Sequence, residues 1–156
     1  MDARTLETTR KRTPMQSKIH LEQWYPHPRA KVWRALTEPA LMEKWGMRPE
    51  GFAPVVGTRF KLVADGKHRG WRGFVECEVL AVEHERLLRI SWIGDEKDPP
   101  QTVTYTLADE RAGTRLTLDH QGFEGLGGLV LSKLILTPGW KGMLRKRLAG
   151  VIGGAA

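Results

Sequence analysis

Cysteine and long apolar segments are scarce in this sequence. The single cysteine, Cys77, excludes an internal disulfide framework and any zinc site built from several cysteines. The longest apolar stretch, Leu126 to Leu136, is interrupted by two glycines, a serine and a lysine. It is far shorter than the ~18 residues that a membrane-spanning helix needs. The first residues are polar and basic, unlike a secretory signal. We therefore expect a soluble, cytoplasmic protein.

Acidic residues are missing from the C-terminal end of the sequence. Residues 133–156 contain 5 basic residues and no acid, and residues 1–18 contain 5 basic and 2 acidic residues. Residues 19–132 contain 15 basic and 16 acidic residues, so the net charge of +7 belongs to the two ends. A nucleic-acid-binding domain usually carries its basic stripe on the folded reading surface. We predict no nucleic-acid binding, because the folded centre is near neutral.

Length and residue pattern indicate one folded domain with a short segment on either side. The 156 residues correspond to a single domain of ordinary size. Residues 1–16 have almost no apolar side chains, and we expect them to form a disordered basic N-terminal tail. The domain is predicted to span residues 17–152, and residues 153–156 to form a frayed C-terminus.

Alternation of apolar and polar residues predicts six strands. They cover residues 17–25, 58–65, 71–82, 86–93, 102–108 and 114–120. Between the first two strands, Pro28 and Pro39 precede apolar residues at helical spacing, which predicts two short helices. The glycine-rich residues 125–128 are predicted to form a loop. The pattern after them predicts a long helix with a kink or break at Pro138.

This order of elements predicts an α+β fold. A sheet with one apolar face, followed by a single long helix, buries that face by curling around the helix. We therefore expect a helix-grip fold: a curved antiparallel sheet of about six strands wrapped around a long C-terminal helix, with two short helices after the first strand. Such curling leaves a concave apolar space, and small ligands bind in spaces of that kind.

Six segments resemble, in the right order, the motifs of a known superfamily. They are residues 27–37 (HPRAKVWRALT), 39–45 (PALMEKW), 57–60 (GTRF), 86–92 (RLLRISW), 113–123 (GTRLTLDHQGF) and 139–148 (GWKGMLRKRL). The chain resembles the START-like helix-grip superfamily, also called SRPBCC. Within it, the chain is similar to the branch related to the C-terminal domain of the heat-shock ATPase activator. The resemblance spans about residues 17–152 and implies the same fold. It implies no catalytic residues, because members share a cavity rather than one chemistry.

Side chains on the predicted inner faces are the candidate ligand contacts. Tryptophan rings that line a pocket stack on flat apolar ligands, although the same rings serve as core mass in many proteins. A tyrosine and a histidine add polar groups that would orient a ligand, and the buried cysteine is expected to behave as a small hydrophobe. The candidate ligand-binding residues are Trp33, Trp45, Phe60, Cys77, Trp92, Tyr105, His120 and Trp140.

The sequence contains no recognisable motif for catalysis, a metal or a cofactor. The 5 histidines have no metal-ligand spacing, and no serine stands in a G-x-S-x-G context. The glycines at 125–128 are not followed by the lysine of a phosphate-binding loop. We therefore predict no catalytic residue, no metal and no cofactor.

The predicted function is non-catalytic binding of a small hydrophobic or aromatic molecule in a cavity between the sheet and the C-terminal helix. Burial of apolar ligand surface would drive that binding. One alternative is an enzyme of the polyketide cyclase or aromatase kind, with Tyr105, His120 or an inward glutamate as acid or base. The resemblance implies a second alternative, a protein that interacts with a heat-shock ATPase chaperone. A third is contact of the basic C-terminal helix and the apolar residues 129–136 with a membrane surface. The protein is expected to be a monomer or a homodimer.

Overall fold

The computed structural model describes residues 16–66 and 70–154 of the chain. The predicted N-terminal tail lies outside the described residues, except for Gln16, which begins the first strand. At the other end the last helix continues through Gly154, beyond the predicted boundary at residue 152. Residues 155–156 of the predicted C-terminus also lie outside the described residues.

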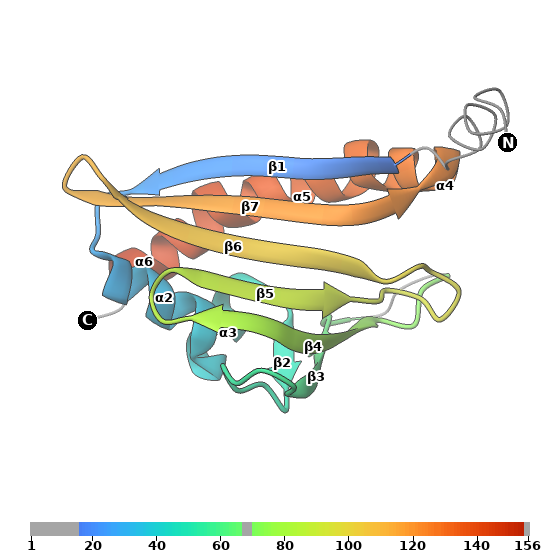
Figure 1. Cartoon of the computed structure of the whole chain (residues 1–156), viewed down its shortest axis with the longest axis horizontal. Coiled ribbons are helices and arrows are strands. Elements are labelled where there is room, and N and C mark those ends of the chain that lie inside the picture. The colour runs from blue at the N-terminus through green and yellow to red at the C-terminus, as the bar shows by residue number, and fades with distance from the viewer. Residues whose placement is uncertain (1–15, 67–69, 155–156) are drawn as a thin grey trace, which may run out of the picture.

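One antiparallel sheet of seven strands makes up one layer, and the C-terminal helix crosses behind it (Figure 1). The strands are β1 (Gln16–Tyr25), β2 (Arg48–Glu50), β3 (Arg59–Val63), β4 (Phe74–Glu83), β5 (Leu87–Trp92), β6 (Gln101–Glu110) and β7 (Gly113–Glu124). Their order in the sheet is β1-β7-β6-β5-β4-β3-β2. The predicted α+β helix-grip fold is thereby confirmed. The additional strand is β2, whose three residues are too few to show a period of two.

Two short helices, α2 (Arg29–Thr37) and α3 (Pro39–Trp45), follow β1 as predicted. Pro39 occupies the first turn of α3, where its missing N–H leaves no helical hydrogen bond unmade. The indole Nε1 of Trp45 donates to the Ala35 carbonyl at 2.8 Å and so ties the end of α3 to α2. This contact holds the Trp45 ring in the core beneath the sheet.

The C-terminal helix runs from Gly125 to Gly154 and differs from the prediction in two places. Its successive turns are α4 (Gly125–Val130), the π-helical turn η1 (Leu131–Leu136), α5 (Thr137–Gly142), the π-helical turn η2 (Met143–Leu148) and α6 (Ala149–Gly154). The loop predicted at 125–128 is wrong, because the helix begins there. Pro138 does not break the helix, since Leu136 and Thr137 on its N-terminal side keep right-handed helical dihedral angles. The π-helical turn directly before Pro138 accommodates a ring that lacks an N–H donor.

Residues that alternate along the strands form the core between the sheet and this helix. The buried apolar residues of the sheet include Ile19, Val75, Val79, Leu88, Ile90, Val103, Leu107, Leu116 and Leu118. The tight turn into β7 depends on Gly113, where a Cβ atom would lie 2.3 Å from the Tyr25 carbonyl oxygen. This close approach lets β1 and β7 pair along their whole length, from Gln16 opposite Glu124 to Tyr25 opposite Thr114.

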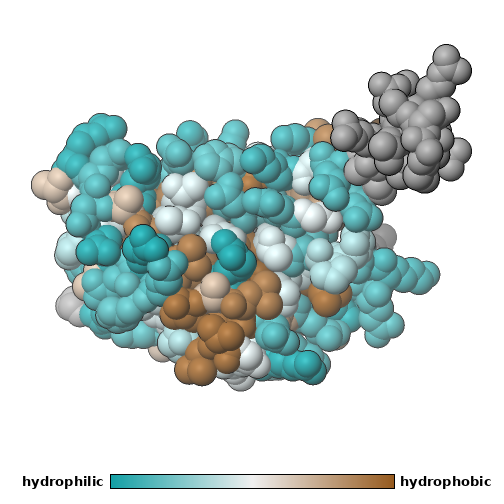
Figure 2. Space-filling model, in the orientation of Figure 1, coloured by the Kyte–Doolittle hydropathy of each residue, from teal (hydrophilic) through white to brown (hydrophobic). Residues whose placement is uncertain are grey.

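The opposite face of the sheet is mostly hydrophilic, with one apolar patch. Figure 2 shows this patch in brown over the lower strands and the loop between β2 and β3. The large apolar side chains that these elements expose are Val55, Val56 and Leu80. A bulge in β4 between Val79 and Ala81 shifts the alternation at this point. Leu80 points outward by the alternation that precedes the bulge, and beyond the bulge Val82 packs against the core.

Candidate ligand-binding site

The space enclosed between the sheet and the helix is small and apolar. Four aromatic rings occupy most of it: the Trp92 and Trp140 centroids are 5.8 Å apart, those of Tyr105 and Trp140 6.2 Å, and those of Trp45 and Tyr105 6.4 Å. The remaining cavity measures about 40 Å3. A drug-sized ligand needs several hundred cubic ångströms, so this inner cavity cannot hold one in the present conformation.

A larger cleft lies at one end of the sheet, beside the first turns of the C-terminal helix. Its volume is about 520 Å3, within the range of small-molecule sites. The sheet side contributes Val75, Trp92 and Gln101, and the helix side contributes Leu131, Ile135 and Leu136. The remaining wall residues are Met47, Trp71, Gly94, Asp95 and Asp98. We call this space the outer cleft.

Trp92 and Met47 belong to the walls of both the inner cavity and the outer cleft. The two spaces are therefore neighbours, with this indole ring and this thioether chain in both walls. Methionine side chains adapt easily to new packing, because they are unbranched and polarizable.

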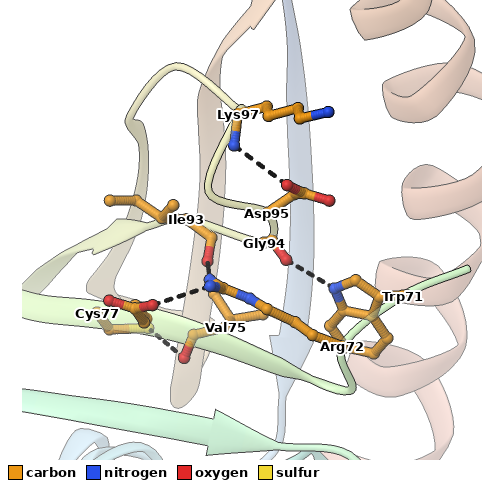
Figure 3. A network of polar contacts seen from close by, with 9 residues as sticks. Trp71, Arg72, Val75, Cys77, Ile93, Gly94, Asp95 and Lys97 are labelled. Carbon is orange, nitrogen blue, oxygen red and sulfur yellow. Dashed lines mark hydrogen bonds and ion pairs between the residues drawn. The ribbon is translucent and has the colours of Figure 1, made fainter.

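Hydrogen bonds to the backbone hold the rim of the outer cleft (Figure 3). The Trp71 indole Nε1 donates to the Gly94 carbonyl at 2.7 Å, and the Lys97 backbone N–H donates to Asp95 Oδ1 at 3.1 Å. Arg72 binds the Ile93 carbonyl at 2.8 Å and stacks on Phe74, with its guanidinium carbon 4.3 Å from the ring centroid. These contacts fix Trp71 and Arg72, just before β4, against the loop that follows β5.

A buried polar network lies behind the wall of the outer cleft. Trp140 Nε1 donates to His120 Nδ1 at 3.2 Å, and His120 Nε2 is 2.8 Å from Gln101 Oε1. The His120 side chain is fully buried among aromatic rings, 5.1 Å from the Trp92 centroid and 4.6 Å from that of Phe123. Burial lowers the pKa of His120 to about 3, because the cationic form would lose its hydration. The imidazole is therefore neutral at physiological pH.

Burial raises the pKa values of two other groups in the core, which makes both groups less reactive as nucleophiles. Burial raises the pKa of the Tyr105 hydroxyl, so the phenol stays protonated. Burial, and to a lesser extent the charge of Glu76, raises the pKa of the Cys77 thiol to about 12. Neither group has the lowered pKa of an activated nucleophile. Within residues 16–66 and 70–154, no cluster of three His, Cys, Asp or Glu side chains could hold a metal ion.

Residues 26–153 match the family described as activator of Hsp90 ATPase homolog 1-like protein. The chain belongs to this family. The match covers most of the chain, including both short helices, six of the seven strands and the C-terminal helix, so the resemblance expected from the sequence motifs is confirmed. No curated protein matches the chain.

Solved structures of similar proteins place this family member in the helix-grip superfamily. MLL2253 from Mesorhizobium loti is 33% identical, with a TM-score of 0.77 over 90% of this chain and 99% of that one. CalU16 from Micromonospora echinospora is 27% identical, with a TM-score of 0.68 over 89% of this chain and 78% of that one. DynU16, a protein in the dynemicin biosynthetic locus, is 24% identical, with a TM-score of 0.67. That match covers 88% of this chain but only 47% of DynU16, and it shows the fold alone.

The structure of this family member divides the eight candidate ligand contacts into two groups. Five line the inner cavity: Trp45, Phe60, Trp92, Tyr105 and Trp140. Of these, Trp92 also lines the outer cleft. Trp33, Cys77 and His120 lie in neither wall. Trp33 instead packs against His84, with ring centroids 6.0 Å apart, and His120 supports the wall from behind through Gln101 and Trp140.

Several wall residues were not among the sequence-based candidates. Gln101 follows Pro99-Pro100 and lies just before the predicted strand 102–108, and Met47 lies between predicted elements. Trp71 begins the predicted strand 71–82 but is not assigned to an inner face. The helix residues Leu131, Ile135 and Leu136 stand in an apolar run that has no single preferred face. The one sequence signal for this wall was the apolar run itself. A helix that packs on one side only needs one apolar face, so apolar residues on a second face indicate a second contact or a binding surface.

Every helix in the described part of the chain is too short or too polar to span a lipid bilayer.

Proposed function

We propose that this protein binds a small, flat, apolar molecule in the outer cleft and carries out no chemistry on it. The observation that supports this most directly is an apolar cleft of about 520 Å3 between the sheet and the helix. Its size suits a molecule of two to four fused rings, and Trp71 and Trp92 offer ring surfaces for stacking. Burial of apolar ligand surface, at about 25 cal/mol per Å2, supplies the driving force.

The chemistry of the two spaces favours binding over catalysis. Among the described residues, Tyr105 is the one titratable side chain in the wall of the inner cavity, and its raised pKa makes it a hydrogen-bond donor rather than a base. Its hydroxyl makes no hydrogen bond to a described residue. Asp95 and Asp98 are at the rim of the outer cleft, where they meet solvent. A cyclase would need an acid and a base deep in the cavity, close to the folded substrate.

Native mass spectrometry of the protein purified from its own host tests the proposal. We expect a retained small molecule of low polarity, released on unfolding. The Ile135→Asp variant places a carboxylate in the cleft wall, and we expect it to lose this molecule. Leu134→Asp is the matched control, because Leu134 is exposed on the same turn but lies outside the cleft wall. Equal retention by both variants would show that the ligand, if any, is not in the outer cleft.

A second candidate function is contact with a heat-shock ATPase chaperone, as the family description suggests. The apolar patch of Val55, Val56 and Leu80 on the outer face of the sheet is the surface that favours it. An Hsp90 ATPase assay with the added protein tests this candidate. Stimulation that is lost in a Val55→Ser, Val56→Ser variant would support it, and an unchanged ATPase rate would reject it.

A further inference from the structure

The direction of each hydrogen bond behind the outer cleft follows from one donor. An indole N–H can only donate, so Trp140 leaves His120 Nδ1 as an acceptor without a proton. The neutral imidazole then carries its proton on Nε2 and donates it to Gln101 Oε1 at 2.8 Å. The relay therefore runs one way, from Trp140 through His120 to Gln101.

This relay decides which end of the Gln101 carboxamide is available to the cleft. The oxygen is engaged by His120, and the nitrogen Nε2 donates to no described residue. Gln101 is only 4% exposed, yet it lines the outer cleft. This nitrogen is not among the sealed-off, unpaired atoms of the described residues, so its N–H groups can donate to a molecule in the cleft.

The backbone around Gln101 explains why this side chain is so deep. Gly122 on β7 has a φ of +102°, and a Cβ atom there would lie 3.0 Å from both Gln101 Cα and the Pro100 carbonyl oxygen. Only glycine permits this approach. Opposite, Gln101 pairs with Trp92 across β5 and β6, so the amide lies beside the indole that lines both spaces.

We propose that the Gln101 Nε2 amide is the polar anchor of the outer cleft and selects flat apolar molecules that carry a hydrogen-bond acceptor, such as a ketone or quinone oxygen. This inference rests on the proposed binding function and adds the chemical class of the ligand. His120 and Trp140 are positioning residues, because they hold the amide with its nitrogen toward the ligand.

Fluorenone and fluorene are suitable probes, because they share a flat tricyclic skeleton and differ in one carbonyl group. Fluorenone is the more water-soluble of the two, so apolar burial alone favours fluorene. We expect the wild-type protein to bind fluorenone about tenfold more tightly, as measured by titration of tryptophan fluorescence, which corresponds to one net hydrogen bond. Gln101→Met should bring the ratio to one or below, because fluorenone then loses its hydrogen bond and only apolar burial remains. Gln121→Met, at an exposed glutamine of β7, is the matched control and should keep the full ratio.

Two further measurements keep the test decisive if Gln101→Met folds poorly. In NMR spectra of the wild-type protein, the side-chain amide signals of Gln101 should shift with fluorenone and stay in place with fluorene. Trp140→Phe removes the donor that fixes His120, so the imidazole nitrogen signals should show both neutral tautomers and the binding ratio should fall several-fold. Equal binding of both probes by the wild-type protein overturns the role of Gln101 and leaves the proposed function standing. If neither probe binds, both the role of Gln101 and the proposed function are overturned.

Discussion

The two halves of the C-terminal helix are both apolar in sequence but are buried to very different degrees. In residues 137–154, Trp140, Leu144, Leu148 and Ile152 recur at every fourth position and are at most 3% exposed. In residues 125–136, Leu126 and Leu134 are 73% and 72% exposed. We call residues 137–154 the anchored half, because their apolar side chains lie in the core. We call residues 125–136 the covering half, because they lie over the outer cleft. Apolar content therefore does not measure anchoring, which depends on one continuous apolar stripe that faces a partner.

The difference has a functional consequence at the cleft. The covering half contacts it through Leu131, Ile135 and Leu136, and its one fully buried residue is Ser132, which is 3.1 Å from the Ser17 hydroxyl oxygen. Few buried apolar contacts mean a low local free energy of opening. For the ligand proposed above, we expect entry by displacement of these first turns, while residues 137–154 stay packed in the core.

The largest expected effect is that of truncating a side chain in the anchored half. Leu148 is fully buried, so Leu148→Ala should lower the free energy of unfolding by about 2–5 kcal/mol. Leu134→Ala in the covering half should change it by less than about 0.5 kcal/mol. Urea denaturation of both variants measures the contrast. Comparable losses at the two positions would show that the halves are equally anchored.

His120 accepts a hydrogen bond from Trp140 of the anchored half. Its burial should make the free energy of unfolding depend on pH. Its pKa is about 3 in the folded protein and 6.5 when unfolded, so between these values the unfolded state binds more protons. Stability therefore falls as pH decreases through this window. From about pH 7 to about pH 4 the loss should be on the order of 3 kcal/mol. His120→Asn should show a correspondingly flatter dependence in urea denaturation, and His84→Gln, at an exposed position, should follow the wild type.

A hydrogen bond that sheet residues make to the anchored half should stabilise the fold more than a hydrogen bond that they make to the covering half. The Tyr25 hydroxyl donates to the Leu144 carbonyl at 2.7 Å in buried surroundings, so Tyr25→Phe should cost about 1–3 kcal/mol. Ser17→Ala should cost about 0.5 kcal/mol, because the Ser132 hydroxyl keeps the Leu129 carbonyl as an acceptor at 3.1 Å. Thermal unfolding of the two variants measures the difference, and the reverse order would contradict the comparison.

The smallest expected effect is a gain of stability in the covering half. A Cβ atom at Gly127 would meet nothing within 4 Å, so Gly127→Ala should stabilise the helix by about 0.5–1 kcal/mol. At Gly128 the added atom would lie 3.0 Å from the Phe123 carbonyl carbon, and Gly128→Ala should give no such gain. Amide hydrogen exchange of residues 125–136 should slow in the first variant alone. Equal protection in both variants would show that helix propensity does not limit this segment.

Much of the fold could be predicted from residue pattern. Alternation placed six strands and their inner faces, and prolines at 28 and 39 marked the starts of the short helices. The site could be predicted only in part: five of eight candidate contacts reach the inner cavity, but Trp92 alone reaches the outer cleft. Periodicity tells which face of an element is buried. It does not tell which distant element packs there, or whether the rings that meet leave a space.

By itself the sequence determined the order of elements, the inward faces of the strands and the anchored stripe of the last helix, because these depend on local spacing. Tertiary structure decided the rest. The helix begins at the glycines of 125–128, where its first turns pack against β1 and β7, and it continues through Pro138 after a π-helical turn. Gln101 becomes a cleft residue only because Gly122 lets two strands approach closely and His120 takes its oxygen. These contacts join residues 19 to 21 positions apart, beyond the range of any local pattern.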